Sequence, residues 1–404
     1  MEVRALRRSW LVSGIGLAGV VLIIGGRSGL GGNPPSGHVG LGGPFAGLTA
    51  AQAVRFNAGK AQFLSVEDLA VGLGPVFNDV SCVACHNSGA SGGAGTRLVT
   101  RFGRLVGGVY DPMVELGGPL IQSQGIGLVN GVNFVAEVVP ATATIVAHRR
   151  TSPLFGLGLI DTIPDHAIAD LADEEANRDP ATAGAISPVA DIANPSHSVG
   201  RFGWKAQHAT LFAFAGDAYT NELGVTTPIL PDENCPQGNC ALLAANPALT
   251  NPNDLDNSAI QTLADFITFL APPPRGPVGR TEQAGEALFA SIGCAACHRP
   301  TWQSGASPVP ALNNVRFSPY SDFLLHDMGS LGDGITQNEA GPTMMRTAPL
   351  WGLRFQTSLL HDGRAATPQV AILQHDGQGL AARNRFARLR PQQRDQLIAF
   401  LNSI

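Results

Sequence analysis

The clearest helical pattern in the chain is an apolar stripe that occurs near residue 270 and again at the carboxyl end. The segments DFITFL (265–270) and QLIAFL (396–401) space their Phe and Leu residues to cover one face of a helix. The segment TEQAGEALFASIG (281–293) has the periodicity of a third helix. We therefore expect helices to form most of the regular structure.

A different pattern occupies residues 96–139, where Val and Gly are frequent and apolar and polar positions partly alternate. Partial alternation of this kind is typical of short strands. Long Gly- and Pro-rich segments separate the periodic ones, since the 404 residues include 49 Gly and 29 Pro. We predict a mainly α protein with long loops and a small β insertion in its first half.

Three landmarks occur twice in the same order, which indicates a duplicated module. The helix endings described above are one of them. The others are Cys-x-x-Cys-His, at 82–86 and 294–298, and the segments RTSPLFGLG and RTAPLWGLR, which start at Arg150 and Arg346. The first copy of the module is the longer one.

The segment APPPRGPVG (271–279) follows the first helix ending and cannot continue a helix. Proline lacks the amide donor and restricts the residue before it. We therefore predict a first domain over residues 50–270, a Pro-rich linker over 271–277 and a second domain over 278–404.

The composition limits the classes of partner. Lys and Arg total 26 against 31 Asp and Glu, the formal charge is −5, and no long block of one sign occurs. This balance argues against nucleic acid as a partner. Only 14% of residues are charged and 6% are aromatic. Loops of this composition need anchoring by more than apolar packing, and a large bound group would provide it.

The amino terminus has the pattern of an export signal. Three arginines precede an apolar run from Trp10 to Ile24, and a Gly- and Pro-rich linker over residues 31–49 follows. The run is shorter than the roughly 20 residues of a membrane span. We predict that residues 1–30 are a removed signal peptide, with a retained membrane anchor as the alternative. Either reading places the remainder outside the cytoplasm, in the periplasm.

The two Cys-x-x-Cys-His motifs predict covalent haem c. In such motifs both thiols bind the porphyrin and the adjacent His binds the iron. A zinc site built from the four thiolates would leave the histidines without a purpose. A redox dithiol would require a strand-helix frame that the sequence lacks. The predicted haem-binding residues are Cys82, Cys85, His86, Cys294, Cys297 and His298.

The two remaining cysteines, Cys235 and Cys240, lie in the polar loop PDENCPQGNCA without a following His. In an oxidising compartment we expect them to form a disulfide that closes this loop.

Several longer segments resemble a known family. They are GLGPVFNDVSCVACHN, RTSPLFGLGLIDTIP, GRFGWKAQ, LLHDMG and RTAPLWGLRFQTSLLHDGRAATPQVAILQHDG. These segments resemble the bacterial di-haem cytochrome c peroxidase superfamily and, within it, the di-haem oxidoreductase group of peroxidases and thiol oxidoreductases. The resemblance covers nearly everything after residue 50. It implies two tandem cytochrome c-like domains, each folded around one haem c.

The resemblance also implies a second iron ligand in the carboxyl-terminal domain, 14 residues after the His of its LLHDG-like turn. In this sequence that position is His375, counted from His361, whereas classical peroxidases have Met there. A pair of His298 and His375 would lower the reduction potential of the second haem. The alternative is a surface His in a turn.

Two further roles come from the resemblance. Glu222 occupies the place of the catalytic Glu of those enzymes, and Trp204 lies one position out of register with the Trp between their two haems. A carboxylate beside an open haem face can move a proton between the peroxide oxygens. The alternatives are an ordinary helix-end Glu and a Trp that only packs in the core.

One departure from the family concerns the first iron. Classical enzymes bind it with a His 16 residues after the motif His, and Phe102 stands there. The first iron is therefore either open or capped from elsewhere, and His326 and Met328 in FLLHDMG are the candidate caps. The alternatives are a loop His and a core Met.

The resemblance implies an oxidoreductase. Its second haem would accept electrons from a small soluble donor, such as a monohaem cytochrome c or a cupredoxin, and its first would reduce a small oxidant, hydrogen peroxide. The alternatives are a di-haem electron-transfer protein without a substrate, and an oxidase of a thiol or protein partner, because fold does not establish reaction. Related peroxidases hold calcium, but no Asp-rich calcium loop is recognisable in this sequence.

Overall fold

The computed structural model describes residues 40–192, 194–245 and 254–404. The predicted export segment and most of the linker that follows it lie outside these residues. No helix within the described ranges combines the length and the apolar character needed to cross a membrane.

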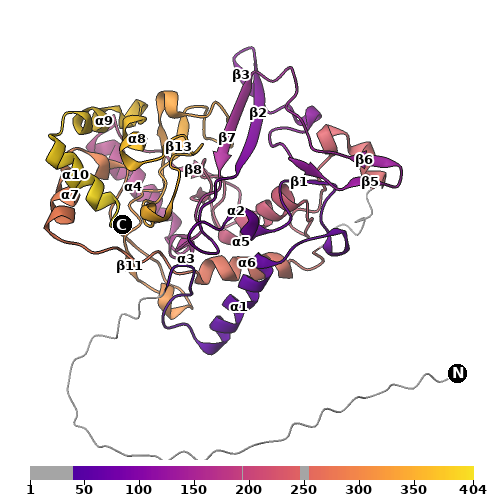
Figure 1. Ribbon diagram of the computed structural model, residues 1–404, viewed down its shortest axis with the longest axis horizontal. Coiled ribbons are helices and arrows are strands. Elements are labelled where there is room, and N and C mark those ends of the chain that lie inside the picture. The colour runs from indigo at the N-terminus through magenta and orange to yellow at the C-terminus, as the bar shows by residue number, and fades with distance from the viewer. Residues whose placement is uncertain (1–39, 193, 246–253) are drawn as a thin grey trace, which may run out of the picture. The chain divides into compact units, whose positions relative to one another are not determined.

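Helices account for more of the regular structure than strands, as predicted (Figure 1). The α-helices are α1 (Ala50–Leu64), α2 (Cys82–Cys85), α3 (Leu157–Asp161), α4 (Asp165–Arg178), α5 (Leu211–Ala218), α6 (Ser258–Phe269), α7 (Arg280–Ser291), α8 (Pro368–Leu373), α9 (Leu380–Ala387) and α10 (Pro391–Leu401). A π-helical turn, Tyr219–Leu223, continues α5. Short 3₁₀ turns lie between these elements.

The strands are short, with the exception of one in the predicted insertion and one just after it. They are β1 (Val76–Phe77), β2 (Leu98–Val106), β3 (Val109–Asp111), β4 (Gln124–Gly125), β5 (Gly127–Val129), β6 (Val132–Phe134), β7 (Ile145–Arg150), β8 (Ser187–Pro188), β9 (Val199–Gly200), β10 (Trp302–Gln303), β11 (Arg316–Phe317), β12 (Leu325–Asp327) and β13 (Met344–Arg346).

The largest sheet is antiparallel and has the strand order β3-β2-β7. A separate antiparallel pair is formed by β5 and β6, which lie between β3 and β7 in the sequence. These strands lie in and just after residues 96–139, so the predicted insertion is confirmed. The sequence analysis did not predict the short pairings of the second half, where β10 pairs with β11 and β12 pairs with β13. Long loops there run antiparallel for two or three residues and satisfy backbone groups in that way.

Two pairs of packed helices show the duplicated frame. Helix α1 packs on α6 in the first half, and α7 packs on α10 in the second. Each pair crosses at a glycine: a Cβ atom at Gly59 would collide with the carbonyl oxygen of Thr262, and one at Gly285 would collide with that of Gln396. The backbones approach too closely at both crossings for any side chain.

A phenylalanine one helical turn after each of these glycines completes the repeat. Phe63 packs on Phe266 with ring centroids 4.7 Å apart. Phe289 packs on Phe400 at 5.3 Å. Each of these two helix pairs therefore places an aromatic cluster beside one Cys-x-x-Cys-His motif.

The main hydrophobic core draws on both halves of the chain. Phe266 of α6 belongs to the same buried cluster as Leu324 and Trp351 from the second half. A second cluster, around Phe289 and Phe400, uses only the second half. The two halves therefore share part of their core, and the boundary at residues 271–277 stays a prediction about sequence modules.

Candidate haem-binding sites

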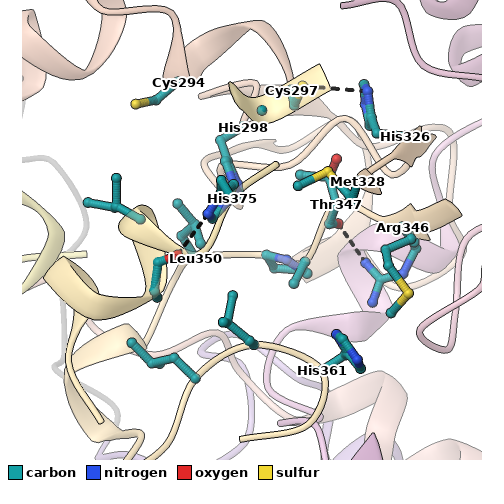
Figure 2. A pocket seen from close by; sticks show the side chains of 18 of the residues that line it. Cys294, Cys297, His298, His326, Met328, Arg346, Thr347, Leu350, His361 and His375 are labelled. Atoms are coloured by element: carbon teal, nitrogen blue, oxygen red, sulfur yellow. Dashed lines mark hydrogen bonds between the residues drawn. The ribbon is translucent and has the colours of Figure 1, made fainter. Parts of the chain in front are cut away.

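The second Cys motif opens into the larger of the two cavities around the motifs, with a volume of about 510 Å³. This lies within the range of roughly 300 to 1,000 Å³ of cofactor pockets. Apolar side chains dominate its wall, including Phe289, Leu350 and Leu397. Figure 2 shows His298 and His375 side by side in this pocket, with Cys294 and Cys297 nearby.

The spacing of His298 and His375 fits two ligands of one metal ion. Their ring centroids lie 6.4 Å apart. Two imidazoles bound through nitrogen at about 2 Å on opposite sides of one ion would have centroids about 6 Å apart. The Nδ1 atom of His298 contacts the carbonyl oxygen of Tyr320 at 3.0 Å, and that of His375 contacts Ala371 at 2.9 Å. A proton held on Nδ1 leaves Nε2 free to bind metal.

Burial keeps both imidazoles in the neutral form that iron requires. It lowers the pKa of His298 to about 4, and it also lowers the pKa of His375. Burial raises the pKa of the Cys294 thiol to about 12, so this thiol is neutral as well. The second site therefore holds two uncharged nitrogen donors next to two unpaired thiols.

His326 and Met328, the candidate caps of the first iron, lie at the second pocket and not at the first. Both line the second pocket (Figure 2). His326 lies on β12, where its Nε2 atom is 2.9 Å from Asp322 Oδ2 and its Nδ1 atom is 3.5 Å from Cys297 Sγ. Strand β12 pairs with β13, which sets His326 opposite Met345.

The first Cys motif forms α2 and the turn after it. His86 is partly buried, and desolvation lowers its pKa to about 4, although the carbonyls of Gly93 and Ser152 oppose the shift. The ring of Phe63 lies 6.1 Å from that of His86, and Phe289 lies 6.3 Å from His298 in the second half. The two motifs therefore have equivalent aromatic neighbours.

The first pocket is smaller, at about 180 Å³. This is below the volume typical of cofactor sites, so its side chains would move aside for a haem. Among the described residues that line it, His86 is the only His, and no Met is present. Phe102 lies in β2 and is buried with Met113 and Ile121 inside the insertion, away from the pocket wall.

Glu222 lines the first pocket from the π-helical turn. Asn78 donates from its side-chain nitrogen to Oε2 of Glu222 at 2.9 Å. Burial raises the pKa of Glu222 to about 7, although Asn78 and Arg101 oppose the shift. The π-helical geometry, which is frequent at functional sites, brings this carboxyl into the same pocket as the first motif.

Trp204 lies in the wall that the two pockets share. It lines both cavities, as do Arg150 and Phe214. Its Nε1 atom donates to the carbonyl oxygen of Arg150 at 3.0 Å, and its ring meets that of His361 edge-on, with centroids 6.3 Å apart. The structure therefore places an aromatic ring between the two motifs.

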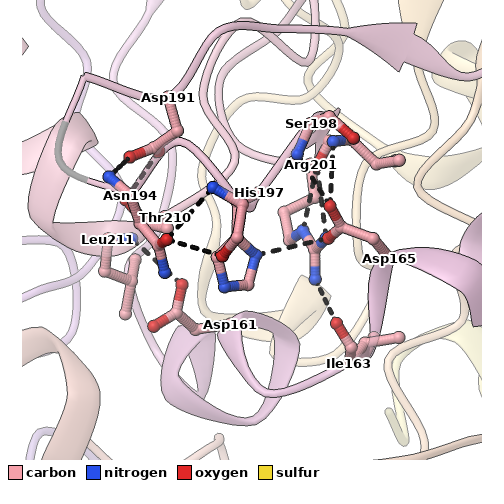
Figure 3. Close-up of polar contacts among 12 residues, drawn as sticks. Asp161, Ile163, Asp165, Asp191, Asn194, His197, Ser198, Arg201, Thr210 and Leu211 are labelled. Carbon is pink, nitrogen blue, oxygen red and sulfur yellow. Dashed lines mark hydrogen bonds and ion pairs between the residues drawn. The ribbon is translucent and has the colours of Figure 1, made fainter.

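A buried arginine anchors the segment that leads to Trp204 (Figure 3). Arg201 pairs with Asp165 and donates to the carbonyl oxygens of Ile163 and Val199. Its side chain is fully buried. The segment is thus tied to the start of α4 three residues before Trp204.

Residues 129–404, more than half of the chain, match the family model described as "Di-haem oxidoreductase, putative peroxidase". The chain belongs to the di-haem oxidoreductase family. No protein with curated annotation matches the sequence.

Solved structures give weaker likenesses. Hydrazine synthase of Kuenenia stuttgartiensis is 14% identical over 98% of this chain and 100% of that chain, with a TM-score of 0.40. A MauG-like protein associated with microbial copper homeostasis is 14% identical over 86% of this chain and 88% of its own, with a TM-score of 0.34. The di-haem peroxidase BthA of Burkholderia thailandensis is 15% identical over 71% of this chain and 93% of that chain, with a TM-score of 0.30. These scores are too low to support any statement about chemistry.

Membership of the di-haem oxidoreductase family implies two haem groups, and the donor sets fit them. Both cysteine pairs are consistent with haem c attachment, since their thiols are unpaired. Burial lowers the pKa of Arg150 and of Arg346 to about 10, and the Nε atom of each donates to a backbone carbonyl oxygen. Haem carries two carboxylates, which buried cations of this kind would neutralise. Within the described residues, no three carboxylates lie close enough together to share a calcium ion.

Sequence reasoning missed two sets of residues in this di-haem oxidoreductase. The crossing glycines with their phenylalanines, Gly59 with Phe63 and Gly285 with Phe289, repeat as G-x-x-x-F, and a comparison of the two halves would have found them. The buried cations around the shared wall carried no sequence signal, because an isolated Arg or Lys is usually exposed.

Proposed function

We propose that the protein is an exported di-haem c oxidoreductase that reduces hydrogen peroxide with electrons from a small redox protein. One haem c would be held by the first motif, with His86 on its iron. The other would be held by the second motif, with His298 and His375. Bound haem would supply the redox chemistry, and the chain would supply ligands, proton transfer and exclusion of water.

The observation that carries the proposal is the difference between the two pockets. The second offers two histidines with ring centroids 6.4 Å apart, which together would leave a haem iron no free position. The first offers one histidine and the partly buried carboxyl group of Glu222. A haem iron with all six ligand positions filled suits electron transfer, whereas one with a free position can bind a substrate. We therefore assign the redox partner to the second site and peroxide to the first.

Glu222 is the proton carrier in this proposal. Its Oε2 atom is held by Asn78, so we assign proton transfer to Oε1. A pKa of about 7 is close to the operating pH, where a group can both take and return a proton efficiently. Trp204, in the wall between the pockets, is the assigned route for electrons.

The test compares Glu222→Gln with Glu233→Gln, a matched control. Burial also raises the pKa of Glu233 to about 7, but Glu233 lines neither pocket. Stopped-flow spectroscopy of the partly reduced haem protein with hydrogen peroxide should show reaction in the wild type and in the control. In Glu222→Gln the rate should fall by roughly 10²- to 10⁴-fold.

Two outcomes would contradict the proposal. In the first, the wild-type spectrum shows two six-coordinate haems and the protein does not react with peroxide. The protein would then be an electron carrier or an oxidase of another substrate. An equal fall of the reaction rate with peroxide in both variants would show that Glu222 has no specific role in proton transfer.

A further inference from the structure

We propose that Asp333 is a positioning residue that fixes Trp204 in the wall between the two candidate haem sites. The inference rests on the proposed function only where it gives that wall a part in electron transfer. The positioning itself follows from buried charges, and it is tested separately.

Asp333 forms ion pairs with two cations from the other half of the chain. Its Oδ2 atom lies 2.8 Å from Nε and 2.7 Å from Nη2 of Arg149. Its Oδ1 atom lies 3.1 Å from Nζ of Lys205. The side chains of Arg149, Asp333 and Lys205 are only 4%, 1% and 0% exposed. Almost no water reaches this cluster.

The cluster holds two cations and one carboxylate, so Asp333 is the shared counter-ion. Burial lowers the pKa of Lys205 to about 8, although Asp333 opposes the shift. Burial by itself would raise the pKa of Asp333, but Arg149 and Lys205 hold it below its usual value. Removing one member of a buried ion pair leaves an uncompensated charge. Removing Asp333 would leave two uncompensated positive charges, those of Arg149 and Lys205.

Both cations are direct chain neighbours of the shared wall. Arg149 precedes Arg150, and Lys205 follows Trp204. Lys205 also donates from Nζ to the carbonyl oxygens of Gly341 at 2.8 Å and Met344 at 2.6 Å. The residue before it is held as well, because Arg346 donates its backbone N–H to the carbonyl oxygen of Trp204 at 2.9 Å. A shift of Lys205 is therefore transmitted to Trp204 within one peptide unit.

Without the carboxylate, Lys205 and Arg149 would have to move toward solvent, or Lys205 would lose its proton. In either case the hydrogen bonds around residues 203–206 would reorganise and the indole ring would change its environment. Asp333 touches neither pocket, since it is absent from the lining of both. It acts on the wall only through Arg149 and Lys205.

The first readout reports on the indole ring itself. The chain contains four Trp residues. The haem-loaded protein is labelled with fluorotryptophan, and the ¹⁹F signal of Trp204 is assigned by its loss in Trp204→Phe. The variant is Asp333→Asn, and the matched control is Asp395→Asn, an exposed residue of α10 in the same half.

We expect Asp333→Asn to shift the Trp204 signal while the Trp302 and Trp351 signals stay in place, and Asp395→Asn to shift none of them. An unmoved Trp204 signal in folded Asp333→Asn overturns the proposal. If Asp333→Asn does not fold, the double variant Lys205→Met/Asp333→Asn, which removes one cation together with the carboxylate, takes its place in the same comparison.

The second readout is the rate at which an electron equilibrates between the two haems after flash reduction. Displacement of the ring should slow it by about tenfold or more. A shifted Trp204 signal with an unchanged rate would support the positioning by Asp333 and overturn the electron-transfer role of the wall. Loss of peroxide reaction with an unmoved signal would overturn the positioning alone.

Discussion

At the scale of single residues, the environment of Glu222 decides what its carboxyl group can do. It lies in the wall of the first pocket, and burial favours its protonated form. Arg101 and Asn78 favour the ionised form, and Asp217 opposes it. The balance puts the pKa at about 7, well above the 4.5 that is usual for a glutamate side chain. The group is therefore poised between its two forms near neutral pH.

This balance predicts the pH dependence of both rate and stability. Proton acceptance needs the ionised carboxylate, so kcat/KM for peroxide should fall below about pH 7 in the wild type. The folded pKa exceeds the unfolded one, so the contribution of this group to stability is complete below about pH 4.5 and is lost as the pH rises to about 7.

The measurements are pH profiles of kcat/KM and of the free energy of unfolding for the wild type, Glu222→Gln and Glu233→Gln. The acidic limb of the kcat/KM profile should vanish in Glu222→Gln and persist in Glu233→Gln. A limb that persists in Glu222→Gln would assign the titration to another group.

At the scale of elements, the loop around the disulfide supports the turn that carries Glu222. Cys235 and Cys240 are bonded, as the sequence predicted. The neighbouring Asn234 donates from Nδ2 to the carbonyl oxygen of Thr220 in the π-helical turn at 2.7 Å. Gln237 donates to the carbonyl oxygens of Leu116 and Val138 in the insertion. The closed loop therefore links the insertion to the first pocket.

The double variant Cys235→Ser/Cys240→Ser should lower the free energy of unfolding by about 2 kcal/mol, the value expected for a short closed loop. Urea unfolding provides the measurement. A dithiol reductant should lower the wild-type midpoint to that of the variant and leave the variant unchanged. Equal midpoints of oxidised wild type and variant would show that the loop is held by its hydrogen bonds alone.

At the scale of the whole molecule, the two halves hold each other through equivalent arginines. The backbone N–H of Arg150 donates to His361 and that of Arg346 donates to Trp204. The Nε atom of Arg150 donates to the carbonyl oxygen of Leu360 at 2.8 Å, one residue before His361. The Nε atom of Arg346 donates to the carbonyl oxygen of Gly203 at 2.7 Å, one residue before Trp204. Each repeated segment therefore crosses to the opposite half, which makes Trp204 and His361 equivalent positions.

Because the halves also share a core, we expect them to unfold together. Leu324 of the second half is 1% exposed in the cluster that contains first-half residues. Leu324→Ala should cost about 2 to 5 kcal/mol. Leu373→Ala, at a side chain 42% exposed, should change stability by less than about 0.5 kcal/mol.

Unfolding of Leu324→Ala is followed by far-ultraviolet circular dichroism and by haem absorbance. Coincident transitions, both moved to lower denaturant concentration, are the expected result. A transition of one half that stays at its wild-type position would show two independent domains.

Local spacing was sufficient for several conclusions. Cys-x-x-Cys-His places three haem-binding side chains within five residues, so the motif can be recognised from the sequence without knowledge of the fold. The loop that pairs Cys235 with Cys240 is equally local, and the structure confirms it. The repeated helix endings could be recognised because the Phe and Leu residues at the ends of α6 and α10 are buried. The family resemblance rested on such segments and is confirmed by the match over residues 129–404.

The tertiary structure alone decided which pocket each distant residue enters. His326 and Met328 carried ligand chemistry in the sequence, but the pairing of β12 with β13 places them at the second site. Trp204 became a wall residue only because both pockets meet there. Asp333 had no signal in the sequence, since its role depends on cations more than 100 residues away. Motifs are defined by neighbours along the chain, whereas shared walls and buried counter-ions are defined by how the two halves pack.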